Sequence, residues 1–304
     1  MWMTDRIQDD RMEENLFDQD FFVKVNQLAI AMNTKMTHGM GGGRKSNAKG
    51  TSVEFSDYRE YIPGDDIRRI DWGAYGRLDK LYIKRFMEEK EGIFQIFIDT
   101  SKSMDFGEPK KARIALQLAG ALSYLVLNNL DRVYVSEMQE SSLTQGKGRA
   151  GKQAFQSIMN ELKRIHFDGR TDLNHAIMKR QYQGSGVSIV ISDFLDPQGI
   201  EEAVKYLKFK KQQVILIQVL ARQELEIEGE GAVNLLDMET GDEVRLSLNR
   251  ATIEQYHAAL DAMTESLRQM ARKYEMTYIR MIADEPLEKF LYDHVCNQGI
   301  IVRK

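Results

Sequence analysis

The sequence of 304 residues has few of the residues that cross-link chains or bind transition metals. It holds one cysteine, Cys296, so neither an intrachain disulfide nor a cysteine-based zinc cluster can form. Its five histidines fall in no metal-binding spacing, and four prolines exclude a proline-rich linker protein. Hydrophobic residues make up 42% of the chain and charged residues 29%, which is typical of a soluble globular protein with its own core.

The chain also lacks a long hydrophobic run and a strong excess of one charge. Its most apolar stretch, residues 119–127, falls well short of the roughly 18 residues that a membrane-spanning helix needs. Residues 1–14 are charged and have no apolar centre, so they predict a disordered tail rather than a signal peptide. The net charge of −4 argues against a protein that mainly coats nucleic acid. We expect a cytoplasmic protein with no membrane span and no nucleic-acid partner.

An N-terminal helix and a β-rich segment precede the main domain. In residues 15–36, apolar positions recur at spacings of three and four, as in an amphipathic helix. The glycine-rich loop at 38–46 is not a P-loop, because Arg44 stands where the second glycine is needed and a helix precedes the loop. Residues 51–90 carry two strand-like segments. We therefore expect residues 15–90 to form a small helix-plus-β subregion packed on the core.

From residue 91 onward, strand-like and helix-like segments alternate. Short apolar runs such as Ile93–Ile98 and Val187–Ser192 are typical of strands that are buried on both faces of a sheet. This alternation predicts an α/β core over residues 91–304, with a doubly wound, mostly parallel sheet covered by helices on both faces. A β-hairpin is expected within this core near residues 234–248.

Oxygen-bearing side chains follow three segments of the predicted core. Asp99, Ser101 and Ser103 come directly after its first strand. Thr171 follows a predicted helix, and Asp193 follows a later strand. An open α/β sheet binds ligands at the carboxyl ends of its strands, where the strand order reverses. We therefore expect these five side chains to meet at one edge of the sheet.

This set of donors suits Mg²⁺, which prefers octahedral oxygen coordination and keeps several of its waters. Ser101, Ser103 and Thr171 are the expected direct ligands, while Asp99 and Asp193 are expected to act through waters. Neutral hydroxyl ligands leave the ion under-neutralised, so an open position can accept a carboxylate from a partner protein. Mn²⁺ accepts the same ligands. The arrangement resembles the metal-ion-dependent adhesion site of von Willebrand factor A-like domains, and it predicts a metal-dependent binding adaptor.

Other interpretations of the same residues remain open. Serine and aspartate are common in turns, and Thr171-Asp172 alone can cap a helix. Haloacid-dehalogenase-like phosphatases also place an aspartate after the first strand, but they need a second carboxylate where Ser101 stands. The alternative function is a Mg²⁺-dependent phosphohydrolase that acts through Asp99, although we assign no catalytic residue. A third possibility is a purely structural protein with an empty site.

The chain is similar to a bacterial family, the domain of unknown function 58, which has a von Willebrand factor A-like, Rossmann-like core. The resemblance covers roughly residues 15–300 and is carried by four segments: Glu54-Phe55-Ser56-Asp57-Tyr58-Arg59-Glu60-Tyr61, Pro63-Gly64-Asp65-Asp66, Arg68-Arg69-Ile70-Asp71-Trp72 and Asp99-Thr100-Ser101-Lys102-Ser103-Met104. It implies no established catalysis, and it implies a MoxR-type AAA+ ATPase or its client as partner in chaperone-like assembly or metal insertion. Many relatives carry an N-terminal pair of membrane helices, which this chain does not show, so membrane attachment is not carried over.

The role of the block from Tyr58 to Trp72 is not implied by the resemblance. Arginines stand among carboxylates in this block, which favours a salt-bridged scaffold with Trp72 as its anchor. Arginine, tyrosine and tryptophan are also enriched where protein interfaces derive most of their binding energy. Arg59, Arg68, Arg69 and Trp72 are therefore candidate partner-docking residues.

Overall fold

The computed structural model describes residues 19–21, 23–27, 54–78, 80–87, 92–182, 184–195, 199–227, 231–236 and 243–296. The chain divides into two compact units. The insert unit is Arg44–Glu91, and the core unit comprises Met1–Gly43 together with Gly92–Lys304. Among the described residues, no helix combines the length and the hydrophobicity that crossing a membrane requires.

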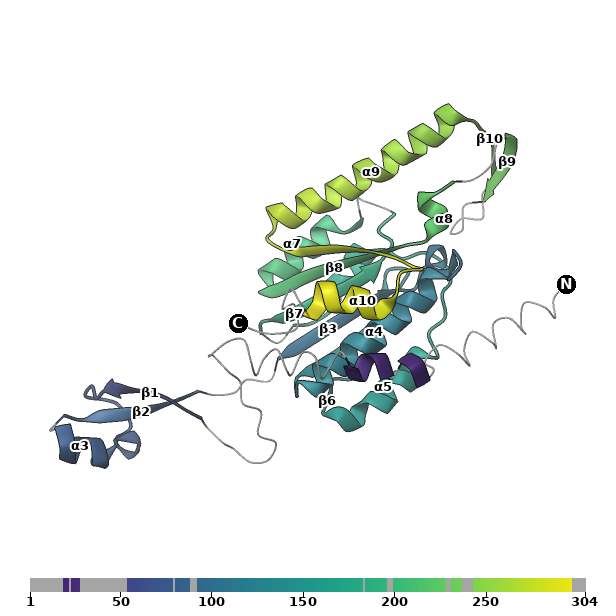
Figure 1. Ribbon diagram of the computed structural model, residues 1–304. Helices are drawn as coiled ribbons and strands as arrows, with labels where there is room; N and C mark the ends of the chain where they lie inside the picture. Colours follow the sequence, from purple (N-terminus) through teal and green to yellow (C-terminus); the bar gives the residue numbers. More distant parts are fainter. Residues whose placement is uncertain are drawn as a thin grey trace. The chain divides into compact units, whose positions relative to one another are not determined.

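The core unit is built on one mostly parallel sheet (Figure 1). Its strands lie in the order β11-β8-β7-β3-β4-β5, where the bounds are β3 (Ile93–Asp99), β4 (Arg132–Gln139), β5 (Ser142–Gln145), β7 (Gly186–Ser192), β8 (Gln212–Leu220) and β11 (Thr277–Ile282). Neighbouring strands are parallel except at one edge, where β5 and the short β6 (Arg149–Ala150) both pair antiparallel with β4. This is a doubly wound order that reverses between β3 and β7.

Helices cover both faces of this sheet (Figure 1). One face carries α4 (Lys111–Asn128), α5 (Phe155–Leu162) and α10 (Leu287–Phe290), which continues as the π-helical segment η5 (Leu291–Cys296). The other face carries α6 (Leu173–Met178), α7 (Glu201–Phe209) and α9 (Arg250–Lys273). Alternate residues of a strand point to opposite faces. Thus Phe94, Ile96 and Ile98 of β3 enter the first hydrophobic cluster, and Phe97 enters the second.

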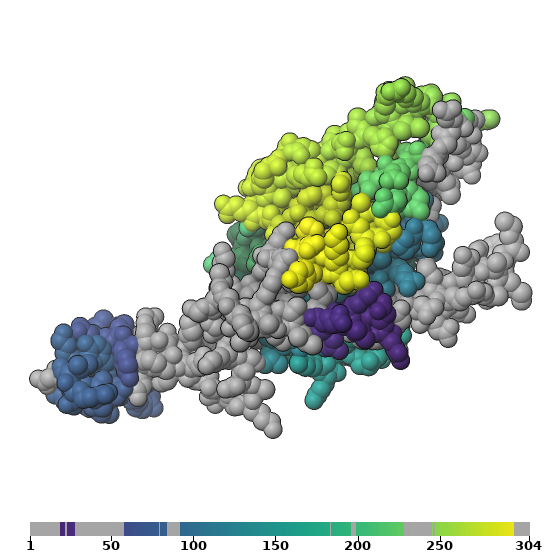
Figure 2. All heavy atoms as spheres, in the orientation of Figure 1, coloured from purple at the N-terminus to yellow at the C-terminus, as the bar shows by residue number. Residues whose placement is uncertain are grey.

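The N-terminal helical residues 19–21 and 23–27 belong to the core unit. Phe21 and Val25 lie in the same hydrophobic cluster as α4 and α10. Figure 2 shows this helical segment in purple beside α10 in yellow, and Lys24 Nζ lies 3.3 Å from Glu288 Oε1. The sequence grouped residues 15–90 as one subregion, and the structure divides them, with Met1–Gly43 in the core unit and Arg44–Glu91 in the insert unit.

Two further predictions concern the hairpin near residues 234–248 and the N-terminal tail. Strands β9 (Gly231–Leu236) and β10 (Glu243–Leu248) pair antiparallel, where the sequence predicts a hairpin near 234–248. The predicted tail at residues 1–14 lies outside the described residues.

The insert unit is a small hairpin with a helical connection. Strand β1 (Glu54–Glu60) pairs antiparallel with β2 (Tyr82–Met87), and the chain between them forms the 3-10 turn η1 (Ile67–Arg69) and the helix α3 (Trp72–Leu78). The sequence predicts no helix here, because α3 is short and two of its seven residues are glycines, which are poor helix formers. The carboxylate of Asp71 accepts a hydrogen bond of 2.9 Å from the Gly73 N–H and so stabilises the first turn.

Candidate functional site

Asp99 is the last residue of β3 and lies at the point where the strand order reverses. Its side chain is buried, and the whole residue is 4% exposed. Its Oδ1 accepts a hydrogen bond of 3.0 Å from the Ser101 N–H, and its Oδ2 accepts one of 2.6 Å from the hydroxyl of Ser192. Since Ser192 ends the neighbouring strand β7, both strands at the reversal point hold this carboxylate in place.

Two serine hydroxyls lie together directly after β3. Ser101 immediately precedes the short turn η2 (Lys102–Asp105), and this turn places Ser103 Oγ 3.0 Å from Ser101 Oγ. Adjacent ligands on an octahedral Mg²⁺ ion, with bonds near 2.1 Å, are about 3.0 Å apart. The loop therefore holds two hydroxyl oxygens at the spacing that a small hard cation needs.

Thr171 reaches the same edge on a loop that is fastened to two strand ends. Two backbone hydrogen bonds of 2.9 Å each join residues 168–169 to residues 100–102. A parallel bridge pairs Thr171 with Glu140, which follows β4. The hydroxyl of Thr171 donates to the carbonyl oxygen of Met138 at 3.1 Å, and this leaves its lone pairs for a cation.

Asp193 faces a buried lysine. Lys111, the first residue of α4, is fully buried, and its Nζ donates to Asp193 Oδ2 at 2.8 Å. The same ammonium group donates to Glu224 in the short helix α8 (Arg222–Leu225). The other oxygen of Asp193 accepts a hydrogen bond of 3.2 Å from the Leu195 N–H. Both carboxylate oxygens of Asp193 are therefore engaged within the protein.

The backbone after β7 turns sharply at the site. Phe194 is buried and has a φ of +51°, in the left-handed region that bulky residues rarely adopt. Such a conformation costs about 1–3 kcal/mol and persists only where the surroundings impose it. The hydroxyl of Ser192 accepts a hydrogen bond of 3.0 Å from the Phe194 N–H, so the residue that holds Asp99 also holds this turn.

Asp99, Asp193 and Glu224 are buried at this edge of the sheet together with Lys111. Burial, with the nearby charge of Asp193, raises the pKa of Asp99, although hydrogen bonds from Ser192 and the Ser101 N–H, together with the nearby hydroxyl of Thr171, partly oppose this. Burial would lower the pKa of Lys111, but Asp193 and Glu224 raise it overall and keep the ammonium charged. Asp193 and Glu224 both pair with this one ammonium, and the charge of Asp193 also acts on Asp99, so the buried group holds more carboxylates than ammonium groups and favours an additional cation.

The chemistry of the donors fits a hard cation rather than a transition metal. Within the part of the chain that the structure describes, no three His, Cys, Asp or Glu side chains gather as a metal-binding group. Zinc needs nitrogen, sulfur or several carboxylate ligands, which this edge does not offer. The hydroxyls of Ser101, Ser103 and Thr171, with the carboxylate of Asp99 behind them, match the oxygen ligands that Mg²⁺ accepts.

The candidate docking residues all lie in the insert unit. Arg59 pairs with Asp65 at 2.7 Å and Arg68 with Asp66 at 3.1 Å, as a salt-bridged scaffold requires. Arg69 is exposed. Trp72 is 64% exposed, and its role in pinning this unit to the core stays a prediction.

Three residues of the site were not found from the sequence. Ser192 ends an apolar strand directly before Asp193. A polar residue at this strand end could have indicated that Ser192 belongs to the site. Lys111 and Glu224 carried no such indication. They meet Asp193 from positions 82 residues before it and 31 after it in the chain, and no local pattern marks either residue.

The chain matches one protein family and several individual proteins. The model of the family described as "Protein of unknown function DUF58" matches residues 57–266. Uncharacterized proteins of Mycobacterium bovis and Mycobacterium tuberculosis are each 25% identical over 252 residues, which cover 81% of this chain and 79% of the relative.

Similar solved structures are less alike in sequence. The conserved hypothetical protein BatB from Bacteroides thetaiotaomicron has 17% identity and a TM-score of 0.44, covering 69% of this chain and 99% of that one. An aerotolerance-related membrane protein from Bacteroides fragilis has 16% identity and a TM-score of 0.41, with coverages of 68% and 99%. The VWA domain of SpRpn10 has 10% identity and a TM-score of 0.39, with coverages of 69% and 98%.

Proposed function

This chain belongs to the DUF58 family of proteins of unknown function, and we propose that it is a protein-binding adaptor that holds Mg²⁺ at its strand-end site. Its doubly wound sheet with an antiparallel edge strand is a von Willebrand factor A-like fold, which supports a role in protein interaction. Mn²⁺ would satisfy the same oxygen donors.

The observation that carries this proposal is the pair of serine hydroxyls in front of the buried Asp99. Ser101 Oγ and Ser103 Oγ lie 3.0 Å apart, and Thr171 approaches the same carboxylate. These three direct ligands are neutral, so a bound ion keeps most of its charge. Such an ion can take a carboxylate from another protein as a further ligand.

The salt bridge of Asp193 supports the same conclusion. Because Lys111 engages Asp193 Oδ2, this carboxylate does not neutralise the ion directly. The ion would therefore remain electrophilic toward an aspartate or glutamate of a partner. Within the family resemblance, the expected partner is a MoxR-type AAA+ ATPase or its client, and the expected process is chaperone-like assembly.

The phosphohydrolase alternative has less support. Both oxygens of Asp99 accept hydrogen bonds and the carboxylate is buried, which disfavours nucleophilic attack. Ser101 cannot shuttle a proton as a carboxylate would. We expect the pure protein with Mg²⁺ not to hydrolyse p-nitrophenyl phosphate. Turnover that Asp99→Asn abolishes would support the enzyme instead.

Metal binding is tested by thermal unfolding in EDTA and in excess Mg²⁺. A ligand at about 100 times its Kd adds about 2.7 kcal/mol to a native state that alone binds it, which raises the Tm by several degrees. Ser103→Ala should lose this increase. Ser142→Ala, which removes an exposed hydroxyl from β5, is the matched control and should keep it.

Partner binding is tested by titrating a purified MoxR-type ATPase into the protein with Mg²⁺ or with EDTA. Wild type and Ser142→Ala should bind only with Mg²⁺, and Ser103→Ala should bind weakly under both conditions. Equal binding in Mg²⁺ and in EDTA would exclude the metal as the bridge between the two proteins.

A further inference from the structure

Exposed apolar side chains are concentrated in the insert unit. Among the described residues, six of the thirteen large hydrophobic side chains that are exposed fall in the 21 residues from 58 to 78: Tyr58, Ile62, Ile67, Trp72, Tyr75 and Leu78. The described buried apolar residues of this unit are Ile70, Ala74 and Ile83. Among the described side chains of this unit, more large apolar groups are exposed than buried, which is typical of an interaction surface.

The helix α3 carries two neighbouring aromatic side chains and, next to them, a glycine. The rings of Trp72 and Tyr75 are in edge contact, with centroids 6.3 Å apart. Ala74 points into the unit, and Trp72 lies on the opposite side of the helix from it. Gly76 is one turn after Trp72, and a Cβ added there would meet no atom within 4 Å. We call Trp72, Tyr75 and Gly76 the α3 face.

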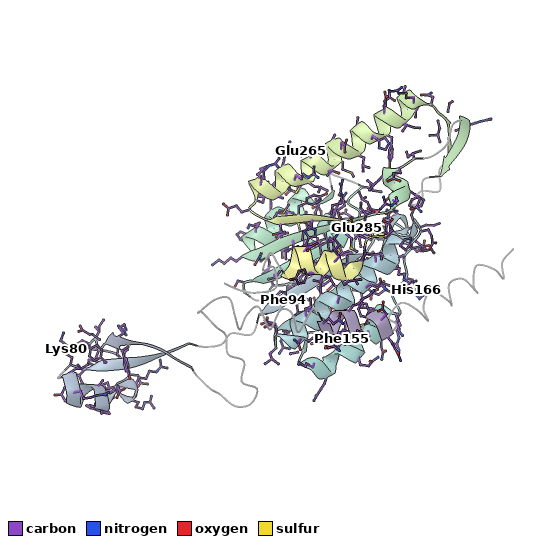
Figure 3. All side chains as sticks on the ribbon, viewed as in Figure 1. Lys80, Phe94, Phe155, His166, Glu265 and Glu285 are labelled. Atoms are coloured by element: carbon purple, nitrogen blue, oxygen red, sulfur yellow. The ribbon has the colours of Figure 1, made fainter. Side chains whose placement is uncertain are left out.

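Among the described side chains, the charge that remains available around this face is positive. The carboxylates described in the unit are engaged: Asp65 with Arg59, Asp66 with Arg68, Glu60 with Lys80 and Asp71 with the hydroxyl of Tyr58. Figure 3 labels Lys80 on this unit. Arg69 and Arg77 are exposed. The charge of Arg69 acts on Asp66, which Arg68 already binds, and no salt bridge of either arginine is found among the described residues. Arg77 instead donates to the Gly73 carbonyl oxygen at 3.1 Å.

We propose that the α3 face docks an acidic amphipathic segment of a protein partner. Apolar side chains of the segment would cover Trp72 and Tyr75, and its carboxylates would pair with Arg69 and Arg77. Gly76 lets the partner's backbone approach the helix closely. Aromatic residues and arginine supply most of the binding energy in protein interfaces, whereas charged pairs at the rim set orientation.

A protein fits this surface better than a nucleic acid. Ile67 and Leu78 are exposed in the same unit and offer nothing to a phosphate backbone. The docking residues belong to the insert unit and the proposed metal ligands to the core unit, so variants of one set can be tested without changing the other.

The first test measures whether the α3 face is open in the free protein. The chain has two tryptophans, so Trp2→Phe leaves Trp72 as its only one. Trp72 should then emit at the long wavelengths of a solvated indole and be quenched readily by acrylamide. Short-wavelength emission with little quenching would show that the rest of the chain covers the face, and this would overturn the proposal.

The second test uses a defined probe in the Trp2→Phe background. The probe is a helical peptide with leucine along one face and glutamate along the other, and its control replaces every glutamate with lysine. The glutamate peptide should shift the Trp72 emission to shorter wavelength in a saturable way. Gly76→Glu places a carboxylate on the face without a steric clash and should weaken this binding by about tenfold.

A matched variant separates local from general charge effects. Gln153→Glu adds the same charge at an exposed position in the core unit and should bind the peptide as wild type does. Equal weakening by Gln153→Glu and Gly76→Glu would overturn the proposal, as would equal binding of the lysine peptide. Tighter binding of a single-stranded oligonucleotide than of the glutamate peptide would identify a nucleic-acid site and refute a protein partner.

Discussion

Lys111 and Asp193 form a salt bridge of 2.8 Å in which the lysine side chain is fully buried and the aspartate side chain is 5% exposed. The same lysine also pairs with Glu224, so one ammonium joins the start of α4, the end of β7 and the helix α8. Removing one partner of a buried ion pair is far more costly than breaking an exposed pair, since the remaining charge stays buried and uncompensated.

Lys111→Met should therefore destabilise the protein by about 3–5 kcal/mol in urea unfolding with EDTA present. The methionine keeps most of the side-chain volume but leaves two buried carboxylates facing each other. Adding Glu224→Gln to this variant should recover part of the loss, because it removes one of the two uncompensated charges. A loss below about 1 kcal/mol would mean that water reaches this cluster in solution.

The variant Asp99→Asn separates the contribution of Asp99 to the stability of the fold from its contribution to metal binding. Burial and the charge of Asp193 raise the pKa of Asp99, so the native state already disfavours the ionised carboxylate when no metal is bound. In EDTA, we expect Asp99→Asn to unfold at a urea midpoint no lower than that of wild type. We also expect this variant to lose the increase in Tm that Mg²⁺ gives to wild type. A large loss of stability in EDTA would show instead that the fold itself needs the charge of Asp99.

Acid should weaken the contact between α7 and α9. The hydroxyl of Tyr274 donates to Glu201 at 2.7 Å and Lys273 Nζ donates to it at 3.0 Å, which lowers the pKa of Glu201 from an ordinary 4.5 to about 2. Because the folded pKa is the lower one, Glu201 contributes stability above pH 4.5, and this is lost as the pH falls toward 2.

The measurement is the urea midpoint at a series of pH values between 2 and 6. In Glu201→Gln, the urea midpoint should fall less steeply between pH 4.5 and 2 than in wild type. In Tyr274→Phe, the fall should be reduced only in part. A decline as steep in Glu201→Gln as in wild type would assign acid sensitivity to other carboxylates.

We expect that replacing the buried Arg180 with an apolar residue will not destabilise the protein. It is 4% exposed, and its Nε and Nη1 atoms make no hydrogen bond in the described structure. Its guanidinium lies 4.3 Å from the ring centroid of Tyr134, a contact worth about 0.5–2 kcal/mol. Leaving buried polar atoms without partners costs about 1–3 kcal/mol. Arg180→Met should thus raise the free energy of unfolding by about 1 kcal/mol, as measured by urea unfolding. A decrease of the same size would show that the contact between the guanidinium and the Tyr134 ring outweighs the cost of the unpaired atoms.

Local sequence patterns were enough to predict the doubly wound core. The run Ile93–Ile98 is apolar at nearly every position because β3 is covered on both faces, and such a run is visible without a structure. Asp99, Ser101 and Ser103 are close in the chain, so their proximity in space follows from one turn.

Long-range contacts explain what the sequence did not reveal. Lys111 looks like an ordinary polar residue at a helix start, and only the folded sheet brings Asp193 and Glu224 to it. Likewise α3 is too short and too rich in glycine to show a helical period, and nothing local indicated that Trp72 would face solvent.

The insert unit is tethered to the core unit at both of its ends. Phe21 and Val25 lie in the hydrophobic core before it, and β3 begins directly after it. For a partner long enough to reach the α3 face and the metal site together, the second contact is intramolecular, at an effective concentration on the order of millimolar. Two contacts that are each weak would then suffice for a long-lived complex, and removal of the proposed metal would leave only the weak contact at the α3 face.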